Sequence, residues 1–190
     1  MPSIYQLKIR LLDIRPPIWR RIQVPGTISL RCLHDAFQVV MGWTDSHLRR
    51  FEKDGDCWGV PEDDEVNELD LIDERKTLLA QVLKSEGDSM VYLYDFVDEW
   101  RHEVTLEKIS RMSNSVKTPV CLGGKRRCPP DGVGGVSGYQ EFLEFIGDPS
   151  HRNYAPFIHW AGGLFRAEEF NLKTVNTILS RMQWPAGPRR

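Results

Sequence analysis

Long hydrophobic runs are absent from this sequence. No stretch of its 190 residues approaches the roughly 18 apolar residues that a membrane span needs, and Met1-Pro2-Ser3 leads into an expected strand instead of a signal peptide. Four cysteines are too few for a disulfide scaffold in a chain of this length, so free thiols are expected. We therefore expect a cytoplasmic protein with no membrane partner.

Familiar catalytic motifs are also missing. The sequence contains neither G-x-S-x-G nor H-E-x-x-H, and no cysteine and histidine stand at a spacing typical of a nucleophilic pair. Its glycine-rich stretch, GGKRRCPPDGVGG, does not match the spacing of a P-loop. Motifs alone therefore assign no reaction, and we expect no cofactor.

Charge is distributed unevenly along the chain. The formal net charge is −2, yet residues 1–50 carry 8 basic and 3 acidic side chains, residues 51–110 carry 6 and 18, and residues 111–190 carry 11 and 6. The stretch 61–74, PEDDEVNELDLIDE, holds eight acids and no base. We interpret it as a solvated acidic loop, because charge runs usually are solvated. An acidic surface for a basic partner, or a cover for a basic groove of the same chain, stays open as an alternative.

Alternation of apolar and polar residues predicts a mostly antiparallel sheet. The stretch 90–109, MVYLYDFVDEWRHEVTLEKI, has the period of two and the aromatic and branched residues typical of a β-hairpin. We expect it to be the centre of the fold. Further strands are predicted over 4–13, 18–24, 47–53 and 57–60.

Helical spacing of apolar residues predicts about four helices. Ser29 and Asn171 are expected to cap two of them, Gly42 to end the first, and Ser137 with Gln140 to form a capping box. The helices are expected over 30–41 and 77–84, after 137 and after 171. Residues 110–137 are predicted to be loop-like and 151–165 an irregular packed segment. The fold class that follows is α+β and roll-like, in one domain spanning 1–190.

Several ordered motifs resemble one family. PPIWRRIQVP, the segment from Leu30 to His34 leading to MGW and HL, YDF-x-D-x-W-x-H, and C-x₆-CPP followed by GG and GY resemble the plasmid pRiA4b ORF-3-like family. The resemblance covers about 5–145, with a C-terminal helical extension over 146–184. It implies an α+β fold and an association with plasmids and transposable elements, and it implies no activity. Val97 stands where the family usually has glycine in the hairpin, and after the CPP motif the chain lacks the family's third cysteine and one of its two acids.

Polar residues gather on the predicted hairpin. Asp95, Asp98 and His102 lie within eight residues and, alone or joined by His34-Asp35 or His47, could form a mixed carboxylate–imidazole acid–base or metal site. The alternative is structural, because a histidine on an apolar strand face usually satisfies a core hydrogen bond. A metal-dependent hydrolase or nuclease built on these residues is our second hypothesis for the function.

Cys121 and Cys128 are weak candidates for half of a zinc site. Structural zinc usually takes pairs of cysteines two to four residues apart, whereas six residues separate these two. A complete site would need His151 or His159 as well. We expect two ordinary thiols.

Basic and aromatic residues together suggest contact with nucleic acid. Arg20 and Arg21 follow Trp19, and Lys125, Arg126 and Arg127 stand in the glycine-rich loop. Such residues neutralise phosphates and stack on bases. Our first hypothesis is a non-catalytic interaction module that binds nucleic acid or a protein encoded by the same mobile element.

Overall fold

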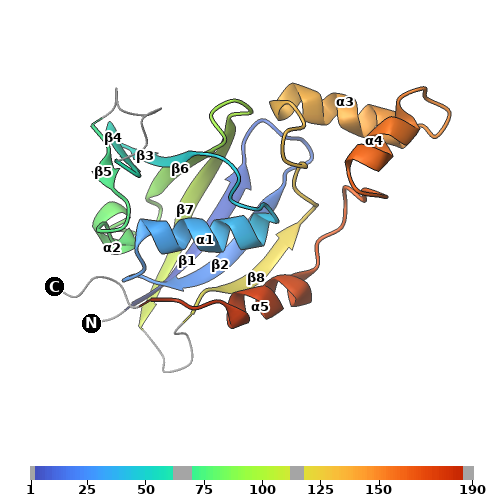
Figure 1. The fold of residues 1–190 in the computed structure, drawn as a ribbon. Helices are drawn as coiled ribbons and strands as arrows, with labels where there is room; N and C mark the ends of the chain where they lie inside the picture. The colour runs from blue at the N-terminus through green and yellow to red at the C-terminus, as the bar shows by residue number, and fades with distance from the viewer. Residues whose placement is uncertain (1–2, 62–69, 112–117, 186–190) are drawn as a thin grey trace.

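The computed structural model describes residues 3–61, 70–111 and 118–185. Its elements are β1 (Ser3–Leu11), β2 (Trp19–Pro25), α1 (Leu30–Met41), β3 (Arg49–Lys53), β4 (Asp56–Gly59), β5 (Ile72–Asp73), α2 (Leu79–Val82), β6 (Ser89–Tyr94), β7 (Trp100–Arg111), β8 (Val120–Lys125), α3 (Gly135–Gly147), α4 (Tyr154–Trp160) and α5 (Leu172–Arg181). They form an eight-stranded sheet in the order β5-β4-β3-β6-β7-β1-β2-β8 (Figure 1). Only β4 and β5 pair in parallel among these strands. The predicted α+β class is confirmed.

The β6–β7 hairpin lies in the middle of the sheet, as predicted. Its cross-strand pairs include Tyr92 with His102. Along its other edge, β7 pairs with β1 in antiparallel fashion. The turn places Asp95 and Glu99 at positive φ, +61° and +51°. Val97 avoids positive φ, which would be costly for a β-branched residue, and its side chain is 91% exposed.

Helix α1 lies across one face of the sheet and begins and ends where the sequence predicts. The Ser29 hydroxyl accepts a hydrogen bond from the Cys32 amide at 3.2 Å, which is an N-cap. Gly42 follows the helix in the left-handed conformation, at φ +90°. The apolar side of α1 faces the sheet, and Phe37 meets the ring of Tyr92 edge-on at 5.2 Å. Most of the core forms in this layer.

Three predictions for the second half of the chain are wrong. Residues 120–125 are a strand. Gly123 and Gly124 have no side chains, so the sequence lacks the alternation of apolar and polar residues that would predict a strand there. Residues 154–160 are a helix, with Pro156 in the first turn, where a missing amide costs nothing. Helix α3 begins at Gly135, so Ser137 lies inside the helix and cannot cap it. The described residues thus hold five helices, where about four were expected.

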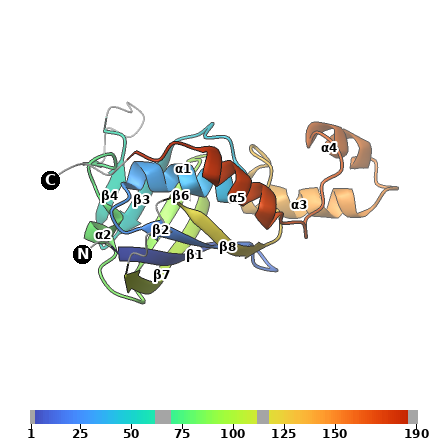
Figure 2. The same cartoon turned by 90° about the horizontal axis from the view of Figure 1, so that it is seen from below.

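Helices α3 and α4 project beyond the sheet, whereas α1 and α5 lie on the same face of it (Figure 2). An aromatic cluster joins α3 to the chain that follows, with Phe142 5.0 Å from Phe165 and 5.8 Å from Phe157 between ring centres. The opposite face of the sheet carries no helix in Figure 2. None of the helices in the described parts of the chain has the length and apolarity needed to cross a bilayer.

Candidate functional site

The two carboxylates of the hairpin turn accept hydrogen bonds from backbone amides. Asp95 is 3% exposed, and its Oδ1 accepts hydrogen bonds from the amides of Val97 at 2.9 Å and Asp98 at 3.3 Å. Its Oδ2 lies 3.5 Å from His47 Nδ1. Asp98 Oδ2 accepts from the amide of Gly134 at 3.2 Å. Both carboxylates therefore fix loops.

His102 points into the core, away from these acids. It is fully buried, and its Nδ1 donates to the carbonyl of Tyr92 at 3.1 Å. The structure thus does not bring Asp95, Asp98 and His102 together. We correct the interpretation of the hairpin as an acid–base or metal site accordingly, since backbone amides engage both carboxylates while His102 lies apart from them in the core, with Nδ1 hydrogen-bonded and Nε2 without a partner among the described residues.

Burial of His102 predicts an acid-sensitive fold. Burial lowers the pKa of His102 from 6.5 to about 4. The unfolded chain therefore binds this proton more readily, and stability falls as the pH falls from about 6.5 to about 4. At about 1.4 kcal/mol per pKa unit, the loss amounts to about 3 kcal/mol. We expect urea unfolding at pH 7 and pH 4 to show this loss in the native chain and a smaller one in His102→Asn, which keeps a donor near Nδ1. The control His159→Asn, at an exposed histidine, should behave like the native chain, and equal pH dependence in all three would contradict the prediction.

Asp131 joins the hairpin acids from a distant segment. Thr44 donates to its Oδ2 at 3.2 Å, while its Oδ1 is buried without a hydrogen-bond partner among the described residues. Burial raises the pKa of Asp131, and the charges of Asp95 and Asp98 raise it further while His47 opposes them. This end of the sheet is therefore acidic. Sequence spacing did not predict that Asp131 lies near Asp95 and Asp98, because the loop after β8 comes close to the hairpin only in the folded chain.

The two cysteines proposed for zinc are separate buried thiols. Cys121 Sγ donates to the carbonyl of Gly123 at 3.5 Å, and Cys128 Sγ lies 3.3 Å from an Arg20 nitrogen. Burial raises the pKa of both thiols, that of Cys128 to about 11. Zinc takes thiolates, so these protonated side chains are poor ligands. Neither belongs to a group of three potential ligands in the described structure, which corrects that assignment.

The group that does have metal-like spacing is an ion-pair network. His34, Asp35 and Asp45 place one ligand atom each within 4.8 Å of one another. His34 already bridges two partners, with Nε2 2.7 Å from Asp45 Oδ1 and Nδ1 2.7 Å from the Tyr92 hydroxyl. Arg31 pairs with both carboxylates. A metal ion there would compete with an arginine that neutralises the same oxygens.

The acidic stretch 61–74 is only partly covered by the structure. Residues 62–69 lie outside the described residues. Glu74, at its end, is fully buried and accepts a hydrogen bond from Arg49 at 2.7 Å. This end of the stretch is therefore part of the fold and is not a solvated loop.

Arg20 is a structural residue. It is 1% exposed, and its five N–H groups are all engaged: by the carbonyls of Trp19, Val40, Lys125 and Arg126 and by the sulfur of Cys128. It thereby ties β2 to the end of α1 and to the chain after β8. Arg20 cannot contact nucleic acid, which corrects its assignment as a binding residue.

The other four predicted basic residues lie in three environments. Arg126 is buried and pairs with Glu168 at 2.7 Å, so it too is removed from the binding set. Arg127 is exposed on the helix side and lies over the ring of Phe165 at 4.7 Å. Arg21 and Lys125 lie on the open face of the sheet. Only these two can act together at one surface.

A cationic and aromatic row crosses the open face. The strand register places Arg10, Trp19 and Lys125 side by side on β1, β2 and β8. In the next row, Lys8 lies beside Arg21, whose guanidinium is 5.4 Å from the ring centre of Trp19. Alternate burial along β2 shows that Trp19 and Arg21 point away from the helices. Sequence reasoning missed Lys8 and Arg10, although their alternation with Leu7 and Ile9 was visible.

Comparison with known proteins agrees with this architecture. A family model described as "Plasmid pRiA4b ORF-3-like protein" matches residues 3–174. The chain belongs to the plasmid pRiA4b ORF-3-like family. This family member is 40% identical over 193 residues to "Uncharacterized protein y4hQ" of Sinorhizobium fredii, covering 99% of this chain and 97% of the relative. It is 39% identical to a solved protein of unknown function, MM3350 of Methanosarcina mazei Go1, with a TM-score of 0.83 over 92% of this chain and 97% of that one. The match runs past residue 145 and takes in α4.

The motifs of the pRiA4b ORF-3-like family meet around Trp43. Its Nε1 donates to the carbonyl of Pro129 at 3.0 Å, and its ring stacks on Tyr94 at 4.9 Å and meets His102 edge-on at 5.2 Å. Arg20, from another motif, contacts Cys128 beside Pro129. These motif residues therefore hold the fold together.

Proposed function

We propose that this family member is a non-catalytic module that binds single-stranded nucleic acid on the open face of its sheet. The observation that carries the proposal is the position of Trp19, an aromatic side chain beside cations on the face of the sheet that no helix of the described residues covers. Base stacking on an aromatic ring, combined with phosphate contacts from basic side chains, is the usual mode of binding single strands. The groups available on this face are cations, amides and ion pairs, and they fit no reaction.

Charge on the open face favours a polyanion. Its basic side chains are Lys8, Arg10, Arg21, Arg50, Arg101, Lys108 and Lys125, and its acidic ones are Glu52, Glu103 and Glu107. Each of the acids pairs with an arginine, as Glu107 does with Arg21 at 2.6 Å. Lys8 and Lys125 form no salt bridge among the described residues, so their charges are available to phosphates.

Gly123 leaves the ring of Trp19 accessible. It lies beside Arg21 across the β2–β8 pair, on the same face as Trp19. A Cβ atom added to Gly123 would come 3.9 Å from the Trp19 ring, so a larger side chain would lie against it. A base can use the space that glycine leaves.

Anisotropy titration of labelled single-stranded DNA and RNA tests the proposal. We expect affinity to fall steeply with salt, and Lys125→Gln to reduce the slope of log K against log salt by about 0.7, the share of one phosphate contact. Trp19→Leu should weaken binding by about 1–3 kcal/mol, the range for one stacked base. Gly123→Val should weaken it without any change in charge, by covering the ring.

Arg127→Gln is the matched control. It removes one positive charge two residues from Lys125, but on the helix side of the sheet. It should leave affinity and salt slope nearly unchanged. Equal effects of the two substitutions would mean non-specific attraction to the whole protein and would overturn the proposed site. Binding that ignores salt, or no binding at all, would overturn the function.

A further inference from the structure

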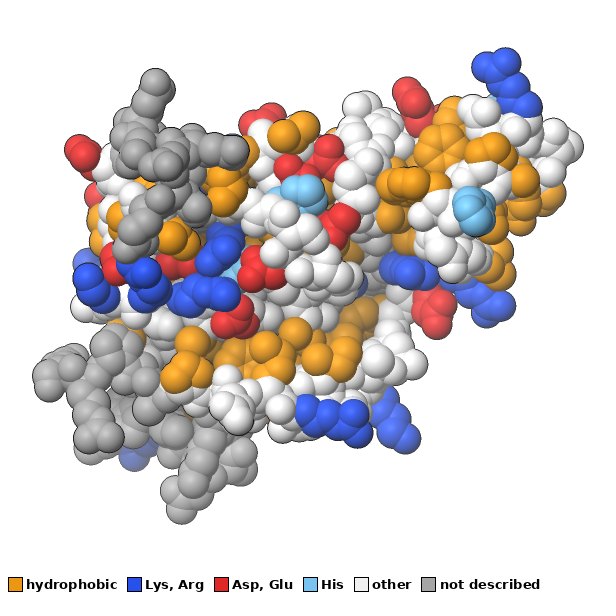
Figure 3. All heavy atoms as spheres, viewed as in Figure 1, with side chains coloured by type: hydrophobic (Ala, Val, Ile, Leu, Met, Phe, Trp, Pro, Cys, Tyr) orange, Lys and Arg blue, Asp and Glu red, His pale blue; other side chains and the backbone are white. Residues whose placement is uncertain are grey.

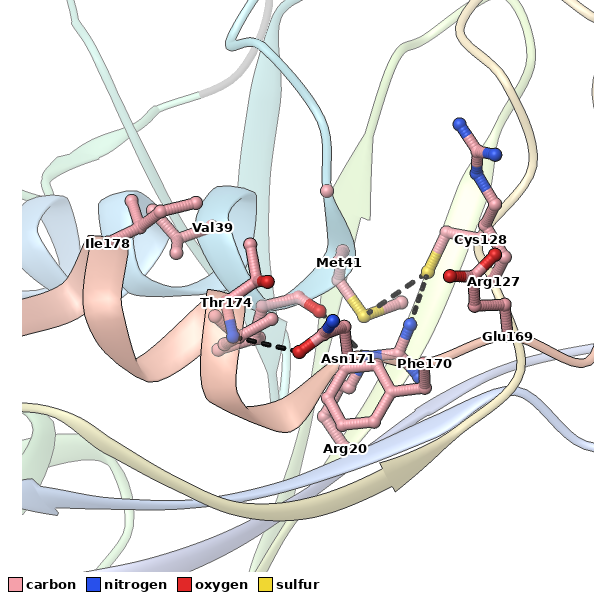
Figure 4. A pocket seen from close by; sticks show the side chains of 13 residues that line it. Arg20, Val39, Met41, Arg127, Cys128, Glu169, Phe170, Asn171, Thr174 and Ile178 are labelled. Atoms are coloured by element: carbon pink, nitrogen blue, oxygen red, sulfur yellow. Dashed lines mark hydrogen bonds between the residues drawn. The ribbon is translucent and has the colours of Figure 1, made fainter. Parts of the chain in front are cut away.

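The helix side of the molecule is a poor surface for contacts to the edge of a base. A band of hydrophobic side chains crosses it (Figure 3). In the cleft between α1 and α5 (Figure 4), the guanidinium carbon of Arg20 lies 4.1 Å from the ring centre of Phe170, which covers it. The side-chain amide of Asn176 is also engaged, because it accepts from the amide of Cys121 and donates to its carbonyl. The open face of the sheet, by contrast, keeps a side-chain amide free.

That free amide belongs to Gln23, whose side chain has no hydrogen-bond partner among the described residues. Burial alternates along β2, so this half-buried residue shares the open face with Trp19 and Arg21. An amide presents a donor and an acceptor side by side, and glutamine uses both to bind the edge of a base. Trp19 and Gln23 are four residues apart, about 13 Å along the strand, so they can contact different nucleotides of one single strand.

Gln6 lies beside Gln23 across the β1–β2 pair and is held by hydrogen bonds. Its Nε2 donates to Glu107 Oε2 at 2.9 Å, and the same oxygen accepts from Arg21 Nε at 2.6 Å. The amino group of Gln6 is therefore turned toward Glu107, while its carbonyl oxygen accepts no hydrogen bond from the described residues. An acceptor held in this way favours a base that offers a donor.

A cation and an apolar side chain complete this row of the sheet. The register runs from Lys108 on β7 through Gln6 and Gln23 to Val120 on β8. Lys108 is exposed and forms no salt bridge among the described residues, so its charge is available to a phosphate. Val120 is half-buried and gives the plane of a base an apolar surface beside Gln23. One row thus holds a phosphate contact, two amides and a surface for the ring.

We propose that this row recognises a base with an amino group beside an acceptor nitrogen, as in adenine and cytosine. The amino group donates to the carbonyl oxygens of Gln23 and Gln6, and the ring nitrogen accepts from the amino group of Gln23. Thymine and uracil carry an acceptor oxygen in place of the amino group, so they cannot donate from that position. The inference rests on the nucleic-acid function proposed above and makes the open face selective for sequence.

Anisotropy titration of labelled hexanucleotides with the intact protein tests this selectivity. A thymidine hexamer is the reference, and one central thymidine is replaced by deoxyadenosine or by deoxycytidine. We expect each replacement to tighten binding about tenfold, within the range for a bidentate contact to one base. Purine deoxyriboside at the same position, which lacks only the amino group of adenine, should bind about as weakly as thymidine.

Substitutions on the row locate the contact. Gln23→Leu should abolish the preference, so that the hexamers with deoxyadenosine or deoxycytidine bind like the thymidine reference. Gln6→Leu should reduce the preference, because one of the two acceptors is lost. Gln140→Leu, at an exposed glutamine of α3, is the matched control and should keep the full preference.

The outcomes separate this inference from the function on which it rests. Salt-dependent binding with equal affinity for all hexamers would overturn the recognition of a base and leave the nucleic-acid function standing. A preference that survives Gln23→Leu would overturn the assignment to this row. If no hexamer binds at any salt concentration, the nucleic-acid function fails, and the inference fails with it.

Discussion

Replacing Arg20 with methionine is expected to lower the free energy of unfolding by on the order of 4 kcal/mol. Methionine keeps the apolar stem but donates no hydrogen bond. The carbonyls of Val40 and Arg126, which accept in buried bonds at 2.7 and 2.8 Å, would lose their donor, and so would that of Lys125. Each buried acceptor left unsatisfied costs about 1–3 kcal/mol. Urea unfolding measures the loss directly.

Arg21→Met is the control for this prediction, one residue along the same strand. Arg21 and Glu107 are 36% and 22% exposed, and an ion pair so accessible to water contributes at most about 1 kcal/mol. Arg20→Lys should recover part of the loss, because an ammonium group can still donate to some of the carbonyls. If Arg20→Met and Arg21→Met cost the same, Arg20 is not the tie that we describe.

The position of Arg20 could have been predicted from the sequence. Side chains of a strand point alternately to its two faces. In IWRRIQV, Arg20 therefore shares a face with Ile18 and Ile22, while Trp19 and Arg21 lie on the other. Both isoleucines are fully buried. A charge on the buried face of a strand must be satisfied by the fold, which identifies Arg20 as structural before any coordinates are known.

The edge strand β8 could not have been predicted in this way. Its glycines carry no alternation, and its existence depends on pairing with β2, about 100 residues earlier in the chain. The side chain of Asn176 also contributes, by accepting from the amide of Cys121 and donating to its carbonyl, both at 2.8 Å. An amide side chain thus takes the place of a further strand and covers part of the edge.

Both parts of the candidate interface depend on the same long-range pairing. Lys125 lies beside Trp19 only because β8 pairs with β2, and Val120 lies beside Gln23 for the same reason. Local patterns identified the residue types of a nucleic-acid interface. They could not separate Lys125, on one face of the sheet, from Arg127, on the other, because that separation arises where the chain turns at the buried Arg126.

Glu74→Ala is expected to lower the free energy of unfolding by about 3–5 kcal/mol, the range for breaking a buried ion pair from one side. Glu74 is fully buried and Arg49 is 12% exposed, with 2.7 Å between Oε1 and the guanidinium nitrogen. The alanine variant leaves that guanidinium without its buried partner. Glu103→Ala removes a carboxylate whose pair with Arg10 is 42% exposed on both sides, and it should cost at most about 1 kcal/mol.

A double variant separates the contribution of the Glu74–Arg49 ion pair from that of the backbone at Glu74. In Glu74→Leu with Arg49→Met, neither buried charge remains, and apolar packing replaces the ion pair. Replacing both members of such a pair is often nearly neutral, so the double variant should be more stable than Glu74→Ala by about 2 kcal/mol or more. A double variant as unstable as the single one would show that the backbone at Glu74, whose carbonyl accepts from the amide of Arg31 at 3.2 Å, matters more than the charges. Backbone hydrogen bonds to β4 and α1 would then hold the end of the acidic stretch in place.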